Sequence, residues 1–154
     1  MRVGRPGAFS RGHTRRFAVL IVDDKLFFRD MLSPIVSAAG YEVATAGSAA
    51  EALDMLEKGA HFDVIVTDTD MPDLDGYSFA RLLRDDPRRS DLPVIAMAAH
   101  AAPAVLAAAR LAGMKGAVGK FDRNALLAAL SEALETVAFN FHELESRVIA
   151  TVNA

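Results

Sequence analysis

The segment that decides the fold reads Phe62-Asp-Val-Ile-Val-Thr-Asp68-Thr-Asp-Met-Pro-Asp-Leu-Asp-Gly76. Its first part, residues 62–67, is a short apolar run of the kind found in strands that are buried on both faces of a sheet. Asp68 follows this run directly, and Pro72 and Gly76 then indicate a loop. The segment therefore predicts a buried strand whose carboxyl end leads into an acidic loop.

The same unit, an apolar run followed by a helical pattern, recurs along the chain. Strands are predicted over residues 17–22, 41–46, 62–67, 92–98 and 116–120. Helices are predicted over residues 25–39, 48–58, 77–84, 103–113 and from about 122 onward. Ser48 and Glu51 have the spacing of a capping box. Five strands that alternate with five helices predict an α/β fold, in which helices cover both faces of a doubly wound parallel sheet.

The composition excludes several classes of protein. The chain of 154 residues has no cysteine, so disulfide scaffolds, zinc sites with cysteine ligands and thiol catalysis are excluded. Its four histidines do not have the spacing of a metal-binding motif. No apolar run is long enough to cross a membrane and no secretory signal is present, so we expect a cytoplasmic protein without membrane insertion.

The charge is distributed unevenly. Residues 1–16 contain five arginines and no acidic residue, whereas residues 17–154 carry a net charge of −8. An acidic body argues against nucleic-acid binding. We therefore expect three parts: a basic flexible tail over residues 1–16, one domain over residues 17–137, and a helical extension over residues 138–154.

Charged residues follow three of the predicted strands. Asp23 and Asp24 end the first strand, Asp68 ends the third and Lys120 ends the fifth. In a parallel α/β sheet, these strand ends lie in one crevice where ligands bind. Clustered carboxylates repel one another, and a hard divalent cation such as Mg²⁺ relieves the repulsion. With a lysine nearby, this set of side chains supports phosphoryl transfer to a carboxylate.

The spacing of these residues resembles a known family. The Asp pair, the D-x-x-M-P-x-x-D-G pattern of residues 68–76 and the downstream Lys120 are similar to the receiver domain of two-component response regulators. The resemblance covers about residues 17–137. It implies a flavodoxin-like (CheY-like) sheet with strand order 2-1-3-4-5. Residues 27–29 (Phe-Phe-Arg) and 120–123 (Lys-Phe-Asp-Arg) look most like receivers fused to chemotaxis histidine kinases.

The resemblance also implies a role for each matching residue. Asp68 would be the phosphoacceptor and would take the phosphoryl group from a phosphohistidine of a sensor or chemotaxis histidine kinase. Asp24 would bind Mg²⁺ directly, Asp23 would act largely through water, Asp68 would be a further ligand and Asp70 would contribute its backbone carbonyl. Lys120 would contact the phosphoryl group. The chain would then be a signalling module that catalyses only its own phosphorylation and dephosphorylation.

Three positions depart from the family pattern. Ala98 stands where receivers carry a serine or threonine, Ala117 stands where an aromatic residue is frequent, and Phe121 replaces the usual cis-proline. A cis peptide bond before Phe121 would cost about 2.5–4 kcal/mol, so we expect a trans bond or local strain. Our hypothesis is that phosphorylation of Asp68 shifts the conformation only weakly, so the protein acts as a phosphate sink or signals by another route.

Two further residues lie beside the predicted site. Asp70 and His100 occupy positions that affect acyl-phosphate hydrolysis in the family. His100 either orients water or lies at the rim of the pocket, and we favour the rim.

The last predicted helix continues beyond the domain. Its apolar residues follow a heptad spacing at Leu127, Leu130, Leu134, Val137, Phe141, Leu144 and Val148. We expect the first half to pack on the sheet. The extension is predicted to form a homodimer or to dock a partner, or else it folds back or frays.

Two other functions remain open at this stage. Because Ala98 and Ala117 lack the switch side chains, the chain could be an interaction module that works without phosphorylation. A more remote alternative is a phosphatase of the haloacid-dehalogenase type, whose nucleophile motif resembles Asp68-x-Asp70. That motif normally lies on the first strand, and this chain has little room for a substrate-selecting cap.

Overall fold

The computed structural model describes residues 16–153, except for the side chains of residues 136–144 and 153. The strands are β1 (Ala18–Val22), β2 (Glu42–Ala46), β3 (Val64–Asp68), β4 (Val94–Ala98) and β5 (Gly116–Gly119). The helices are α2 (Leu26–Ala38), α3 (Ala49–Glu57), α4 (Gly76–Asp85), α5 (Pro103–Leu111) and α6 (Arg123–Asn153). All strand pairs are parallel and the order is β2-β1-β3-β4-β5. The predicted fold and strand order are confirmed.

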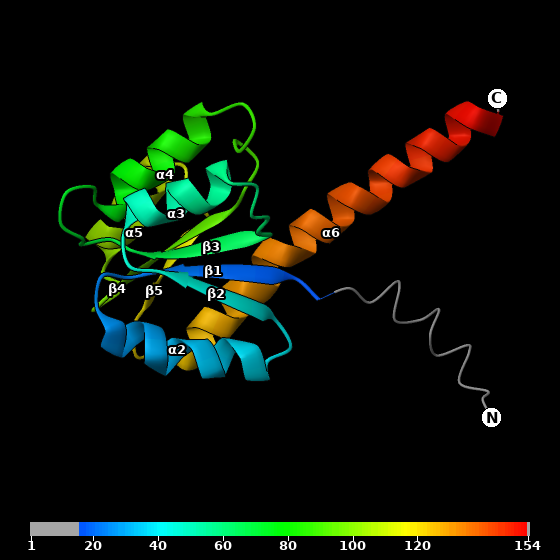
Figure 1. Cartoon of the computed structure of the whole chain (residues 1–154). Helices are drawn as coiled ribbons and strands as arrows, with labels where there is room; N and C mark the ends of the chain where they lie inside the picture. The colour runs from blue at the N-terminus through cyan, green and yellow to red at the C-terminus, as the bar shows by residue number, and fades with distance from the viewer. Residues whose placement is uncertain (1–15, 154) are drawn as a thin grey trace.

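Two helical layers cover the sheet, with α3, α4 and α5 on one face and α2 and α6 on the other (Figure 1). Neighbouring residues of the central strands point into different layers because side chains alternate along a strand. Leu20 and Ile65 pack in the first cluster, and Ile21 and Val66 pack in the second. The strands therefore read as continuous apolar runs, as expected for a sheet that is buried on both faces.

Local signals set several helix boundaries. The Ser48 side chain accepts a hydrogen bond from the backbone N–H of Glu51 at 3.0 Å and caps α3. The Glu51 carboxylate accepts from the N–H of Gly47, one residue before the expected capping-box partner. Gly59, just after α3, has a φ of 97°, a conformation that favours glycine. Pro34 lies inside α2, which continues to Ala38 as one helix.

Helix α6 is one continuous element of 31 residues that extends away from the sheet (Figure 1). Leu126, Leu130 and Leu134 are buried against the sheet, as predicted for the first half of the helix. The helix continues without a break past residue 137, as the absence of Gly and Pro predicted, and the domain boundary expected there stays a prediction. The predicted seam positions Val137, Phe141 and Leu144 lie outside the described side chains.

The predicted basic tail lies outside the described residues except for Arg16. The guanidinium of Arg16 donates hydrogen bonds to the carbonyls of Gly40 and Tyr41, at 3.2 and 3.0 Å. These contacts lie at the amino-terminal edge of the sheet, opposite the strand ends that carry the acidic residues.

Candidate functional site

Three carboxylates come together at the carboxyl ends of β1 and β3. Asp23 and Asp24 follow β1, and Asp68 is the last residue of β3. One carboxylate oxygen from each residue lies within 4.8 Å of the other two. Asp23 and Asp68 are buried, whereas Asp24 is partly exposed. The cluster forms because β1 and β3 are neighbours in the sheet, so their ends open into the same crevice.

Lys120 brings a single cation to this cluster. It follows β5, and its backbone N–H donates to the carbonyl of Ala98 at 2.8 Å. Its Nζ lies 2.9 Å from Asp23 Oδ2 and 3.2 Å from Asp68 Oδ2, and the side chain is 8% exposed. One buried ammonium therefore faces two buried carboxylates, while the third carboxylate, Asp24, is paired at 3.5 Å with the exposed ammonium of Lys25.

The environment of Asp68 opposes its ionisation. Burial raises the pKa of the Asp68 carboxyl group above its ordinary value, and the negative charge of Asp23 adds to this effect. The backbone N–H of Asp70, 3.2 Å from Asp68 Oδ1, and the ammonium of Lys120 act in the opposite direction. The charged form of Asp68 is thus incompletely compensated by the protein alone.

The donor atoms fit a hard divalent cation. Asp23 Oδ2, Asp24 Oδ1 and Asp68 Oδ2 are buried oxygens that make no hydrogen bond within the described residues, although two of them lie against Lys120. Buried polar atoms normally have partners, and here one ammonium serves two of these oxygens while Asp24 Oδ1 has no partner among the described residues, which indicates a place for a further cation. Carboxylate oxygens are the ligands preferred by Mg²⁺. The residues present therefore fit the predicted metal.

Two hydrogen bonds fix Asp23 in the β1–α2 loop. The N–H of Lys25 donates to Asp23 Oδ1 at 2.9 Å, which orients that carboxylate. The guanidinium of Arg29, from the first turn of α2, donates to the Asp23 carbonyl at 2.6 Å. The sequence pattern indicated only a subfamily resemblance for Arg29. Its hydrogen bond to the Asp23 carbonyl was not predicted.

The end of the acidic motif has a structural role. Asp75 caps α4, because its side chain accepts a hydrogen bond from the N–H of Ser78 at 2.8 Å. Gly76 begins the helix and lies against the backbone of Asp68 and Thr69, where a Cβ would meet the Asp68 carbonyl oxygen. The Asp-Gly pair therefore folds the loop tightly back over the strand that carries Asp68.

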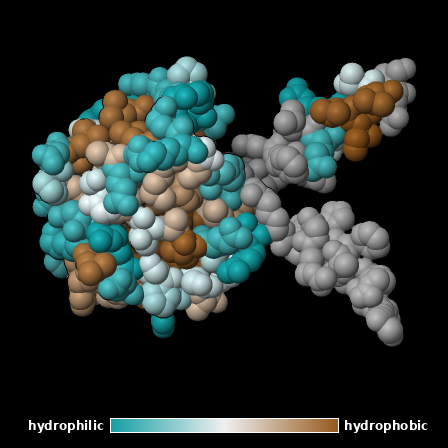
Figure 2. Space-filling model, viewed as in Figure 1, coloured by the Kyte–Doolittle hydropathy of each residue, from teal (hydrophilic) through white to brown (hydrophobic). Residues whose placement is uncertain are grey.

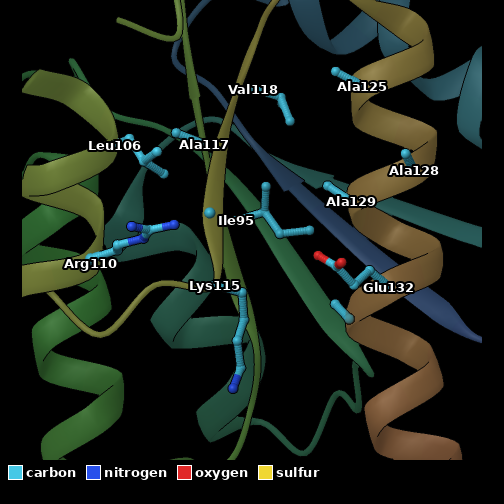
Figure 3. A pocket seen from close by; sticks show the side chains of 12 residues that line it. Ile95, Leu106, Arg110, Lys115, Ala117, Val118, Ala125, Ala128, Ala129 and Glu132 are labelled. Atoms are coloured by element: carbon cyan, nitrogen blue, oxygen red, sulfur yellow. The ribbon is translucent and has the colours of Figure 1, made fainter. Parts of the chain in front are cut away.

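The two predicted switch positions are both alanines in the sheet. Ala98 is the last residue of β4, and Ala117 lies in β5. A hollow of about 600 Å³ lies over β5 between α5 and α6, and Figure 3 shows Ala117 on its wall, with Arg110, Lys115 and Glu132 also lining it. None of the clustered acidic residues lines this hollow. The face where receivers often place an aromatic ring is therefore open.

The remaining site predictions lie near the crevice. His100 is exposed and lines a shallow hollow beside Phe121, an arrangement that agrees with a rim position. Asp70 follows the acceptor strand and contacts Asp68 through its N–H. The peptide bond before Phe121 is trans, as expected. The structure thus brings Asp23, Asp24, Asp68 and Lys120 together, and their individual roles stay predictions.

One contact at the site was not anticipated. The Nζ of Lys120 lies over the ring of Phe28, 4.1 Å from the ring centroid. Phe28 also meets Phe27 and Phe121 edge to face, with ring centroids 5.2 and 5.5 Å apart. The sequence signal for this contact was the aromatic pair after the Asp pair, but spacing alone does not show which ring faces the lysine.

The sequence model of the response regulator receiver domain matches residues 19–131. The chain belongs to the response regulator receiver domain family. This receiver is similar to a gliding motility regulatory protein of Myxococcus xanthus, with 37% identity over 89 residues, which are 58% of this chain and 11% of that protein. The chain spans 11%, 13% and 32% of the lengths of the first three curated relatives.

Solved structures agree with this assignment. The receiver superimposes on the chemotaxis response regulator CheY4 of Vibrio cholerae with a TM-score of 0.69 and 32% identity, over 77% of this chain and 99% of that one. A solved chain described as a trimeric coiled-coil segment of yeast Spc42 fused to another protein matches with a TM-score of 0.75 and 28% identity, over 88% of this chain and 89% of that one.

Within residues 16–153, no helix combines the length and the apolar character that crossing a membrane would require.

Proposed function

We propose that this receiver accepts a phosphoryl group on Asp68 from the phosphohistidine of a partner kinase. The observation that carries the proposal is the buried Asp68 carboxylate, which lies 3.2 Å from the ammonium of Lys120 and within 4.8 Å of carboxylate oxygens of Asp23 and Asp24. An Asp68 carboxylate oxygen attacks the phosphorus, the phosphorus–nitrogen bond of the donor breaks, and the imidazole leaves as the product. The same chain then hydrolyses its acyl phosphate and is not a turnover enzyme for other substrates.

Each residue of the cluster has a task in this transfer. Asp23, Asp24, Asp68 and the backbone carbonyl of Asp70 would hold Mg²⁺. When bound, the ion supplies positive charge for the oxygens of the transferred group. Lys120 moves its ammonium from the free carboxylate to a phosphoryl oxygen, which its flexible stem allows. The N–H of Asp70 keeps one Asp68 oxygen oriented, so that the other faces the donor.

The experiment that tests the proposal is intact-mass measurement after incubation with acetyl phosphate and Mg²⁺. We expect the wild-type chain to gain one phosphoryl group and the Asp68→Asn variant to gain none. If the folded wild-type chain gains no mass at saturating Mg²⁺, the phosphoacceptor function is wrong and the alternative, a module that binds partners without phosphorylation, takes its place.

Mg²⁺ should stabilise the fold through the same carboxylates. At a free concentration of 100 times the Kd, we expect the free energy of unfolding to rise by about 2.7 kcal/mol, because only the folded chain presents the cluster. Urea unfolding with and without Mg²⁺ measures the change. Asp24→Asn should remove most of it.

Asp73→Asn is the matched control, since Asp73 lies exposed in the loop after Asp68 and asparagine tolerates its positive φ of 71°. An equal loss of the Mg²⁺ effect in both variants would contradict the assigned ligands.

The alanines at positions 98 and 117 affect how strongly phosphorylation can change the conformation of this receiver. Ala98 offers no hydroxyl to a phosphoryl oxygen, and a hydrogen bond to a charged group contributes about 1.5–3 kcal/mol. A two-state equilibrium that lacks this bias shifts less on phosphorylation. We therefore infer that phosphorylation of Asp68 changes the conformation of β4 and β5 only weakly. Such a receiver could act as a phosphate sink or could signal through other residues.

Helix α6 is a second functional surface, and we infer that it pairs with a second copy of this chain. Val148, Ile149 and Val152 are 56%, 58% and 77% exposed, and Figure 2 shows apolar side chains gathered near the end of the helix. Val148 continues the heptad spacing of the buried leucines. The similarity to a coiled-coil fusion over 88% of this chain supports a helix that can pair beyond the sheet.

Self-association should therefore depend on the end of α6. We expect analytical ultracentrifugation to show an assembly for the wild-type chain and a monomer for the double variant Val148→Glu, Val152→Glu. Leu111→Glu is the control, because Leu111 is an equally exposed apolar residue at the end of α5. A monomeric wild-type chain at high concentration would instead leave α6 as a docking helix for a different partner.

A further inference from the structure

The usual reporters of phosphorylation are absent from β4 and β5, so the state of Asp68 must be read by other groups that touch it. Among the described residues, only one side chain from another strand end contacts the Asp68 carboxylate, and that is Lys120 at 3.2 Å. The other recorded contact is the N–H of Asp70, which belongs to the same loop as Asp68. Any signal that leaves through a side chain therefore starts at the ammonium of Lys120.

The ammonium of Lys120 is held on two sides. On one side are the carboxylates of Asp23 and Asp68, and on the other is the face of the Phe28 ring, 4.1 Å away. A cation over a ring face is held by the ring quadrupole, which is weaker than a charge-assisted hydrogen bond to a phosphoryl oxygen. A phosphoryl group on Asp68 adds negative charge and new acceptors, so the ammonium turns toward them and its place over the ring changes.

The ring of Phe28 connects this buried ammonium to the surface. Phe28 lies in the first turn of α2 and meets both Phe27 and Phe121 edge to face. Phe27 is 64% exposed and Phe121 is 70% exposed, so a shift of the Phe28 ring appears directly at the surface. These three residues, Phe27, Phe28 and Phe121, form an aromatic cluster beside the crevice. Phe121 also stands where the general family pattern has a proline, so the edge-to-face contact between Phe28 and Phe121 depends on this departure from the pattern.

We propose that Phe28 is the positioning residue for Lys120, and that the aromatic cluster of Phe27, Phe28 and Phe121 reports the phosphorylation of Asp68 at the surface. The inference rests on the proposed function of Asp68 as acceptor. The path runs from Asp68 through the Lys120 ammonium and the Phe28 ring to Phe121. It takes the place of a hydroxyl at Ala98 and an aromatic ring at Ala117.

The position of Lys120 can be tested without any phosphoryl group. A proton that lies over an aromatic face is shielded by the ring current, so the ε-methylene protons of Lys120 should resonate upfield of those of the other lysines. Phe28→Leu should return them to the ordinary range, whereas Phe28→Tyr should keep the upfield shift. Unshifted Lys120 protons in the folded wild-type chain would overturn the positioning role.

The report at the surface is tested with a fluorescent probe. The chain has no tryptophan, so Phe121→Trp introduces a single one. Addition of Mg²⁺ and beryllofluoride, which mimics a phosphoryl group on a carboxylate, should change the emission of this probe. The change should disappear when Phe28→Leu is added and persist with Phe28→Tyr. Leu111→Trp is the control, because Leu111 is 78% exposed at the end of α5. The emission of a tryptophan there should not change when beryllofluoride binds.

The outcomes separate the two proposals. Beryllofluoride binding is followed independently by its fluorine resonance and by its loss in Asp68→Asn. Binding without an emission change at position 121, or an emission change that survives Phe28→Leu, overturns the aromatic route and leaves the acceptor function intact. Absence of beryllofluoride binding to the folded wild-type chain overturns both.

Discussion

Replacing Lys120 with methionine should lower the free energy of unfolding by about 3 kcal/mol in the absence of divalent cations, because removing one partner of a buried ion pair leaves the other charge uncompensated. Lys120 is the cation that faces both Asp23 and Asp68, and it is buried with them. Methionine keeps the length and apolar stem of lysine, so the expected loss comes from the charge. Urea unfolding in the presence of a chelator measures it.

The matched control for this variant is Lys58→Met. Lys58, the residue after α3, forms an ion pair with Asp54 at 2.9 Å, but both side chains are largely exposed. Exposed pairs contribute little to stability, so the control should change the unfolding transition hardly at all. Mg²⁺ should restore part of the loss in Lys120→Met only. Equal effects of the two substitutions would show that the cluster does not depend on the lysine.

Gly76→Ala should cost about 3 kcal/mol and weaken Mg²⁺ binding at the same time. A Cβ at this position meets the carbonyl oxygen of Asp68 and approaches the Thr69 Cα at 3.0 Å, and backbone atoms cannot move aside as a flexible side chain can. The strand end that carries Asp68 would therefore shift. Urea unfolding gives the stability, and titration with Mg²⁺ followed by calorimetry gives the affinity.

Gly116→Ala is the control for this substitution. A Cβ on Gly116 meets no atom within 4 Å, and its backbone does not have a positive φ. The same added methyl group should therefore be tolerated in β5. Similar losses in the two variants would indicate that alanine in place of glycine, and not the contact with Asp68, causes the effect.

Much of the fold could be predicted because each buried strand has a continuous run of apolar residues in the sequence. The predicted strand 62–67 corresponds to β3 (Val64–Asp68), and the predicted strand 92–98 corresponds to β4 (Val94–Ala98). The strands begin later than predicted, because apolar residues such as Phe62 and Leu92 also pack into the core just before the strand hydrogen bonds begin. Hydrophobicity reports burial, and it does not by itself report backbone pairing.

The grouping of the site could be predicted because strand ends are fixed by topology. Once the sheet is parallel, residues that follow β1, β3 and β5 open into one crevice, and the carboxylates and Lys120 meet there. The contact between Lys120 and Phe28 could not be predicted in this way. It depends on the rotamer of a flexible lysine and on the packing of Phe121, neither of which leaves a periodic pattern in the sequence.

The length of α6 shows another limit of sequence patterns. The heptad spacing and the absence of Gly and Pro after residue 119 predicted a long helix, and the structure has one from Arg123 to Asn153. The expected boundary between the domain and the extension at residue 137 stays a prediction. A helix can leave its sheet without any change in its own hydrogen bonds, so the boundary is set by what the sheet covers.

The most direct test of the central claim is to locate the phosphoryl group. After incubation with acetyl phosphate and Mg²⁺, borohydride reduces an acyl phosphate on aspartate to homoserine, and peptide mass spectrometry then identifies the residue. We predict homoserine at Asp68 and at no other acidic residue, with none in a sample treated without acetyl phosphate. Homoserine at Asp23 or Asp24, or at no position in a folded chain at saturating Mg²⁺, would contradict the account.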